Sequence, residues 1–208
     1  TWTTSDKNIA TVSSSGVVTP VRAGTCEITA RYKYGSYSYE YVEAKCKVTC
    51  TFEGSDLRYP LSAQSGKVIT LQKFSSEPSY KVKVNITKVV RGAQANQLAL
   101  KENSNNKTSS GYEWCFIYAD IEHISNSKGS NTSLEAVDVL YKDDLFTDSG
   151  SSVTVQKLAT FSHNLKGQGI FDVEIYPGGK GSAILAVLIP ETTGDILLKV
   201  PNLKSNTW

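Results

Sequence analysis

Four cysteines are the side chains of this sequence with the clearest chemical potential. They lie at positions 26, 46, 50 and 115, and four cysteines permit three complete disulfide pairings. A zinc site would need further Cys or His ligands that converge in space. The spacing Cys46-x3-Cys50 is a poor match, and His123 and His163 lie far along the chain. We therefore expect disulfides or buried thiols rather than a metal site.

Residues that could act in hydrolysis lack the spacing that hydrolysis requires. A nucleophile elbow has the pattern Gly-x-Ser-x-Gly, and this sequence does not contain it. Ser152 or Ser162 could be grouped with His163 and Asp172 as a triad. Serine and aspartate are so frequent here, however, that such a trio carries almost no information. We expect no catalytic residues, no enzymatic activity and no cofactor.

One acidic run offers hard oxygen ligands. It consists of Asp138, Asp143, Asp144 and Asp148. Calcium requires about six to eight oxygen ligands, and the spacing fits no EF-hand loop. A solvated hairpin loop is the simpler interpretation. Calcium dependence, or an undetected hydrolase activity within residues 51–208, is kept as the alternative function.

The composition excludes some partners and favours β structure. The formal net charge is only +2, whereas a nucleic-acid-binding face needs many unpaired basic residues, so we expect no nucleic-acid partner. No apolar run approaches the roughly 18 residues that span a bilayer. Abundant Thr, Ser, Val, Tyr and Gly, without sustained helical periodicity, predict an all-β protein.

The stretch from Ile9 to Ala30 shows the clearest strand pattern. Residues 9–12 alternate apolar and polar side chains, as a half-buried strand does. A serine-rich turn ends at Gly16, and the next strand ends near Pro20, which cannot donate a ladder hydrogen bond. Residues 26–31 alternate again. Three short strands joined by two tight turns are therefore predicted.

These motifs, taken in order, resemble the group 2 bacterial immunoglobulin-like domain. The matching features are Trp2, Thr4-Ser5-Asp6, Ala10-Thr11-Val12, Gly16, Val18-Thr19, Ala23-Gly24-Thr25, Glu27-Ile28-Thr29-Ala30 and Cys46-Lys47-Val48-Thr49. The family has leading strands before the Trp strand, and residues 1–50 lack them. The resemblance therefore implies the C-terminal part of such a domain, cut within the domain, and an exported protein of the bacterial cell surface.

The last hairpin of this domain can be aligned by its buried face, because a one-residue slip would expose every apolar side chain. A three-residue or bulged tip is predicted, which pairs Cys26 with Cys46, Ile28 with Ala44 and Ala30 with Val42. Cys26–Cys46 is thus the preferred disulfide, since exported proteins favour disulfides. Cys50 and Cys115 are left to join the two halves of the chain or to remain reduced.

The predicted hairpin gathers aromatic and basic side chains on its outer face. They are Tyr37, Tyr39, Tyr41, Arg31 and Lys33. This candidate aromatic patch suits the binding of a protein or a carbohydrate, and it also suits packing against a neighbouring domain.

The remaining residues, 51–208, read as a larger antiparallel β-sandwich. Apolar alternation predicts strands near 68–71, 80–90, 112–121, 134–140, 152–158, 170–176, 183–189 and 195–200. The 112–121 strand is the most apolar of these, so we expect it at the centre. Turn signals at regular spacing are typical of immunoglobulin-like sandwiches.

Three motifs of this half resemble immunoglobulin-like domains of unknown function in secreted and lipid-anchored proteins of Gram-positive bacteria. They are G-Y-E-W at 111–114, P-G-G-K-G at 177–181 and A-V-L-I-P-E at 186–191. The family implies a fold and an extracellular location rather than a reaction. The sequence therefore predicts a non-catalytic cell-surface or secreted protein for display, adhesion or binding of an extracellular protein or carbohydrate.

Overall fold

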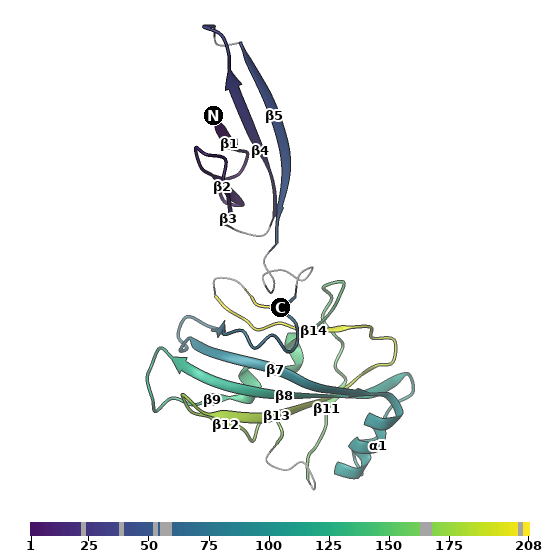
Figure 1. Cartoon of the computed structure of the whole chain (residues 1–208). Helices are drawn as coiled ribbons and strands as arrows, with labels where there is room; N and C mark the ends of the chain where they lie inside the picture. The colour runs from purple at the N-terminus through teal and green to yellow at the C-terminus, as the bar shows by residue number, and fades with distance from the viewer. Residues whose placement is uncertain (22–23, 38–39, 52–53, 55–59, 163–167, 204–205) are drawn as a thin grey trace. The chain divides into compact units, whose positions relative to one another are not determined.

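The computed structural model describes the chain except residues 22–23, 38–39, 52–53, 55–59, 163–167 and 204–205. It divides into two compact units, Thr1–Tyr59 and Pro60–Trp208 (Figure 1). The division falls inside the segment that the sequence assigns to the start of the second domain. Antiparallel sheets dominate both units, so the predicted all-β sandwich class is confirmed.

The first unit contains two small sheets. The larger has the order β1-β4-β5, and the smaller pairs β2 with β3. Their bounds are β1 Trp2–Thr4, β2 Ala10–Val12, β3 Val18–Pro20, β4 Gly24–Lys33 and β5 Tyr41–Cys50. The turn before β3 contains Gly16 at a φ of 86°, and a Cβ there would lie 2.7 Å from the Trp2 ring. Glycine therefore lets the indole lie over the turn.

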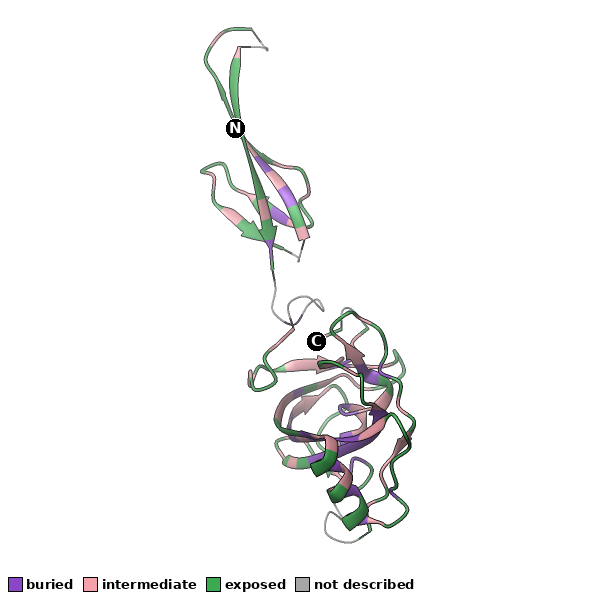
Figure 2. Ribbon diagram, turned by 90° about the vertical axis from the view of Figure 1, so that its right-hand side faces the viewer, coloured by how far each residue is buried: buried purple, intermediate pink, exposed green. Residues whose placement is uncertain are grey.

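The core of the first unit occupies only the end of the long hairpin where Cys50 lies. Its buried residues are Ala10, Cys26, Ile28 and Cys50. From Tyr41 to Lys47 every residue of β5 is exposed, and Figure 2 shows exposed residues along the distal hairpin. The hairpin thus extends beyond the part that the β2–β3 sheet stabilises.

The register of this hairpin corrects the predicted one by two residues. Cys26 lies opposite Val48, Ile28 opposite Cys46, and Ala30 opposite Ala44. The apolar side chains keep the predicted face, because a shift of two preserves the alternation. The predicted three-residue tip is too short.

Polar contacts close the wider tip and favour the observed register. The Tyr34 amide donates to the Glu40 carbonyl at 3.0 Å, and the Tyr37 amide donates to the Glu40 carboxylate at 2.8 Å. Arg31 and Glu43 become direct cross-strand neighbours joined by an ion pair. Opposite charges at such positions stabilise a pair of strands.

The second unit is built on one five-stranded antiparallel sheet of order β11-β13-β8-β7-β6. The strands are β6 Ile69–Leu71, β7 Tyr80–Arg91, β8 Tyr112–Asn126, β11 Lys157–Leu158 and β13 Lys180–Pro190. The central position of β8 confirms the prediction for 112–121. Its side chains are buried on both faces, as a strand between two packed layers requires.

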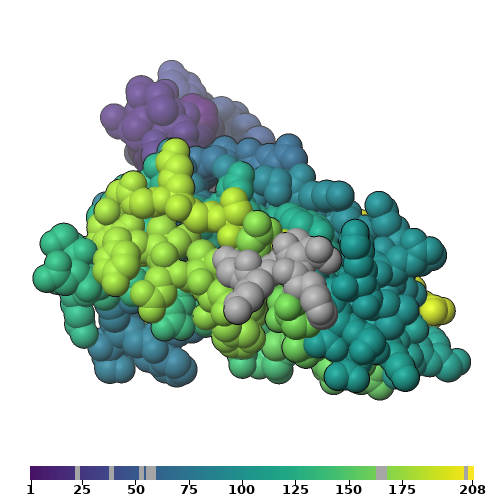
Figure 3. Space-filling view, turned by 90° about the horizontal axis from the view of Figure 1, so that it is seen from below, coloured from purple at the N-terminus to yellow at the C-terminus, as the bar shows by residue number. Residues whose placement is uncertain are grey.

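Short elements cover one face of this sheet and a helix covers part of the other. The first layer contains β9 Leu134–Glu135, η1 Ala136–Asp138, η2 Lys142–Asp144, β10 Leu145–Thr147, β12 Glu174–Ile175 and β14 Ile196–Leu198. The helix is α1, Gly92–Glu102, which packs against β8. In Figure 3 the teal segment that contains α1 and the yellow-green segment that contains β12 and β13 lie on opposite sides of the view.

Several predicted strands of this unit are shorter than expected. Residues 134–140 form only the two-residue β9 before turning into η1, since a 3₁₀ turn buries Leu134, Ala136, Val139 and Leu140 together. Only residues 157–158 of the predicted 152–158 strand and 174–175 of the predicted 170–176 strand belong to named strands. The predictions near 68–71, 80–90, 183–189 and 195–200 are confirmed by β6, β7, β13 and β14.

Candidate binding surfaces

Three exposed tyrosines lie at the end of the first unit's hairpin that is far from Cys50. Tyr32, Tyr34 and Tyr37 are 69%, 65% and 63% exposed. Tyr39, part of the predicted patch, lies outside the described residues. Of these three exposed tyrosines, the predicted patch included only Tyr37. It missed Tyr32 and Tyr34 because the alternation assigns Tyr32 to the buried face, whereas the core ends before that position.

Arg31, Lys33 and Tyr41 share the outer face of the hairpin, as predicted, with Lys33 directly opposite Tyr41. The Arg31 guanidinium lies 4.1 Å from the centre of the Tyr41 ring. It also donates to Glu43 Oε2 from Nη2 at 2.6 Å and from Nε at 3.0 Å. These hydrogen bonds lower the pKa of Glu43 and raise that of Arg31. One face of the Tyr41 ring is therefore already occupied by a cation.

All four cysteines are described, and all four are free thiols. The predicted Cys26–Cys46 bridge is absent because the observed register places Val48, not Cys46, opposite Cys26. Cys26 and Cys50 are buried in the first unit's core, whereas Cys46 is exposed farther along the same face. Cys115 belongs to the buried sheet face of the second unit, where burial raises its thiol pKa to about 11. Cys50 and Cys115 thus lie in the cores of different units and are not bridged.

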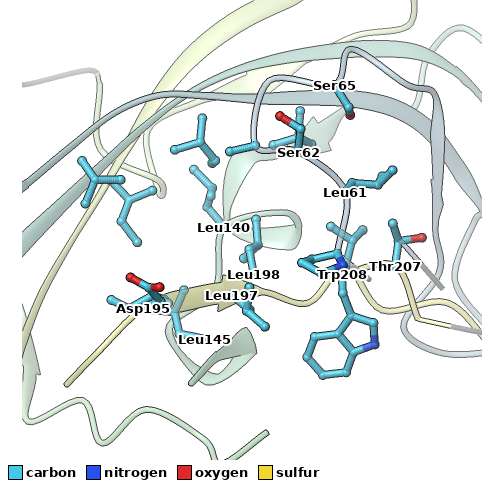
Figure 4. A pocket seen from close by; sticks show the side chains of 18 of the residues that line it. Leu61, Ser62, Ser65, Leu140, Leu145, Asp195, Leu197, Leu198, Thr207 and Trp208 are labelled. Carbon is cyan, nitrogen blue, oxygen red and sulfur yellow. The ribbon is translucent and has the colours of Figure 1, made fainter. Parts of the chain in front are cut away.

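The second unit contains a cavity of about 530 Å³. Its lining comes from β7, β8, η1–β10, β14 and the two segments at the ends of the unit. In Figure 4, Asp195 lies at one end, Ser65 and Thr207 lie at the other, and Leu140 and Leu198 lie between them. Ligand pockets typically measure about 300–1,000 Å³. No sequence motif indicated this cavity, because its walls come from residues far apart in the chain.

Aliphatic side chains form the sheet wall of the cavity. They are Val84, Ile86 and Val89 of β7, together with Ile117 of β8. An irregularity in the β7–β8 register falls between Ile86 and Lys88. The additional residue keeps Val89 on the same face as Ile86, although three positions separate them, because a bulge shifts the alternation by one.

The lining also includes Arg91, whose charge is already satisfied. Its Nε donates to Glu113 at 2.8 Å, and Nη2 lies 2.6 Å from the same carboxylate oxygen. Nη1 donates to the Gly194 carbonyl at 2.9 Å and Nη2 to the Thr193 carbonyl at 2.6 Å. Arg91 therefore fixes the loop before β14 to the end of β7 and to the start of β8.

The acidic run does not converge. Asp138 pairs with Lys73 at 3.8 Å, Asp144 pairs with Lys199 at 3.3 Å, and Asp143 pairs with its neighbour Lys142. Burial raises the pKa of Asp138. Within the described part of the chain, no group of three His, Cys, Asp or Glu side chains is arranged to hold a metal ion.

Of the residues considered for a triad, Ser162 has other hydrogen-bond partners. His163 lies outside the described residues. The Ser162 hydroxyl donates to the Glu102 carbonyl at 2.9 Å and accepts from Asn103 at 3.0 Å. Ser162 thus links its loop to the end of α1.

No family model, curated protein or solved structure matches this chain. The resemblance to bacterial immunoglobulin-like domains therefore stays a prediction. Among the described residues, none of the helices has the length and apolar character needed to cross a bilayer.

Proposed function

We propose that this chain is a non-catalytic binding protein, either secreted or displayed on the bacterial cell surface. In this proposal the first unit presents its hairpin tip to an extracellular protein or carbohydrate. The observation that carries the proposal is the exposure of Tyr32, Tyr34 and Tyr37, each more than 60% exposed on a hairpin that extends beyond its core.

The chemistry of tyrosine supports this role. A tyrosine ring offers a large contact area with few rotatable bonds, and its hydroxyl can donate or accept a hydrogen bond. Tyrosine is accordingly enriched at protein interfaces and among the residues that dominate binding energy. Lys33 and Tyr41, whose ring is held by Arg31, form the last pair of the ladder before the tip and lie next to it.

The test compares two sets of variants on arrays of glycans and of immobilised extracellular proteins. The double variant Tyr34→Ser/Tyr37→Ser removes two rings of the tip. We expect it to weaken binding about 30-fold, which corresponds to the roughly 2 kcal/mol of a dominant interface residue.

Phe171→Ser is the matched control, because Phe171 is an exposed aromatic residue (68%) of the other unit. It should leave binding unchanged. Unaltered binding by the tip variant, or an equal loss in the control, would refute the hairpin tip as the contact surface.

A further inference from the structure

The cavity of the second unit has no part in the proposed role of the hairpin. It opens between the β7–β8 face of the main sheet and the opposing β14. Several of its apolar wall residues are only partly buried, although they border the main core. They are Ile69, Val84, Ile86, Ile196 and Leu198. A group that displaced water from these walls would gain the free energy of apolar burial.

The charges of the lining favour an uncharged occupant. Arg91 is neutralised by Glu113 and by two backbone carbonyls. The other two charged lining residues, Lys67 and Asp195, are opposite in sign. The wall thus offers no net charge to a ligand, and an ion that entered the aliphatic part would lose its hydration without compensation.

The walls also disfavour a peptide strand as the occupant. A peptide brings one amide N–H and one carbonyl per residue, and each needs a hydrogen-bond partner when buried. The lining includes the side chains of Val84, Ile86, Ile117, Leu140 and Leu198, which provide none. Figure 4 places Leu140 and Leu198 between the two ends. The polar lining residues include Ser65, Thr207 and Asp195, which Figure 4 places toward the ends.

We propose that this cavity is a binding site for an uncharged small molecule with a single aliphatic chain. The chain lies along the β7 wall between Val84 and Val89, and an uncharged polar head group reaches hydroxyl groups at the Ser65 and Thr207 end. This is a second binding site, and it does not depend on the hairpin tip.

The test uses the full chain and 1-decanol as the probe, with binding followed by calorimetry and by methyl NMR. Addition of 1-decanol should shift the methyl resonances of Ile86, Ile117 and Ile196. Decanoate and decylamine have the same chain with a negative or a positive head group. We expect each to bind about tenfold or more weakly, because a charged head group would lose hydration that the hydroxyl groups of Ser65 and Thr207 only partly replace.

Val89 lines the cavity and is 52% exposed, so Val89→Trp should fill the cavity from its rim. We expect this variant to weaken 1-decanol binding by about tenfold or more. Val68→Trp is the matched control, because Val68 is 50% exposed and does not line the cavity. Val84→Phe fills the same wall from a second position, should Val89→Trp fail to fold.

The outcomes separate the possible occupants. Loss of binding in the filling variants, with binding retained in Val68→Trp, supports the site. Four results would overturn it. Three concern ligands: methyl shifts confined to residues outside the cavity, equal binding of decanoate and 1-decanol, or selective binding of an apolar peptide instead. The fourth is a dimer that buries the cavity residues and that 1-decanol does not dissociate, which would assign the cavity to a second copy.

Discussion

At the scale of single residues, the hydrogen bonds around Asn126 indicate which ring nitrogen of the buried His123 carries a proton. The Asn126 side-chain oxygen accepts from the amides of Lys128 and Gly129, each at 2.8 Å. Its nitrogen must therefore be the donor, and it reaches the Thr132 carbonyl at 3.0 Å. The same nitrogen lies 3.3 Å from Nε2 of His123, which accordingly acts as an acceptor.

We predict that His123 adopts the tautomer with its proton on Nδ1. Nδ1 lies 2.7 Å from the Ile175 carbonyl, which can only accept. Nitrogen-15 NMR should show a protonated Nδ1 and an unprotonated Nε2. His123→Phe leaves the Ile175 carbonyl and the Asn126 amide without this partner, and it should cost about 1–3 kcal/mol of unfolding free energy. A protonated Nε2 in the native protein would contradict the assignment.

The Cys115 thiol gives a second prediction at this scale. Burial raises its pKa from 9.0 to about 11 in the folded state. The free energy of unfolding that this pKa difference contributes is therefore fully present below pH 9 and is lost as the pH rises through about 11. Cys115→Ala should remove this part of the alkaline destabilisation. The measurement is the unfolding free energy of both proteins from pH 8 to 11, and parallel curves would contradict the prediction.

At the scale of elements, the alternation of apolar residues determines which face of a strand is buried but not how far two strands slide. The β4–β5 pairing illustrates this limit: Cys26, Ile28 and Ala30 face the predicted side, yet their partners differ by two residues. The deciding contacts were Arg31–Glu43 and the closure of the tip by Glu40. Such contacts depend on the tip geometry, which the alternation alone does not specify.

Disulfide trapping can test this register. Ala30 and Ala44 are direct partners, so Ala30→Cys/Ala44→Cys should cross-link under mild oxidation in a Cys46→Ser background. Ala30→Cys/Val42→Cys joins the partners of the predicted three-residue tip and is the matched control. It should cross-link much less, as judged by the mobility shift on reduction. Equal cross-linking of both pairs would show that the strands slide.

Helix α1 was not predicted because the apolar residues that it buries fully are both alanines. Ala95 and Ala99, four positions apart, are fully buried beside Trp114 and Phe116 of β8. Alanine contributes little to an apolar pattern, although its size is what lets the helix approach the sheet. Asn106 also holds this region together. Its side-chain oxygen accepts from the Thr160 amide at 2.9 Å, and its backbone carbonyl accepts from the Trp114 indole at 3.0 Å.

The close approach of α1 leads to a prediction about volume. Ala99→Leu should destabilise the second unit by about 1–3 kcal/mol, because the larger side chain has no room against β8. Leu100→Gln, on the exposed side of the same helix, should change the stability by less than about 0.5 kcal/mol. Denaturant unfolding measures both. A stabilising Ala99→Leu would show that the interface contains unfilled space.

At the scale of the whole molecule, strands and fold class could be predicted, but the cavity could not. β7 and β8 are visible in the sequence because their own residues alternate. The cavity combines those strands with residues near 60–67, near 194–200 and at 207–208, which meet only in the folded chain. A hydrogen bond and a ring contact hold the two ends of the second unit beside the cavity. The Leu61 amide donates to the Trp208 carbonyl at 2.7 Å, and the Trp208 ring packs on Phe146.

The separate cores of the two units predict two unfolding transitions. The first unit has four buried core residues, whereas two larger clusters stabilise the second. Trp2 reports on the first unit and buried Trp114 on the second, so Trp208→Phe leaves one reporter in each. In urea, Trp2 fluorescence should change at the lower concentration and with the smaller m-value, because less surface becomes exposed. As a control, Trp2→Phe should remove the fluorescence change of the first transition. Coincident transitions of the two reporters would contradict independent units.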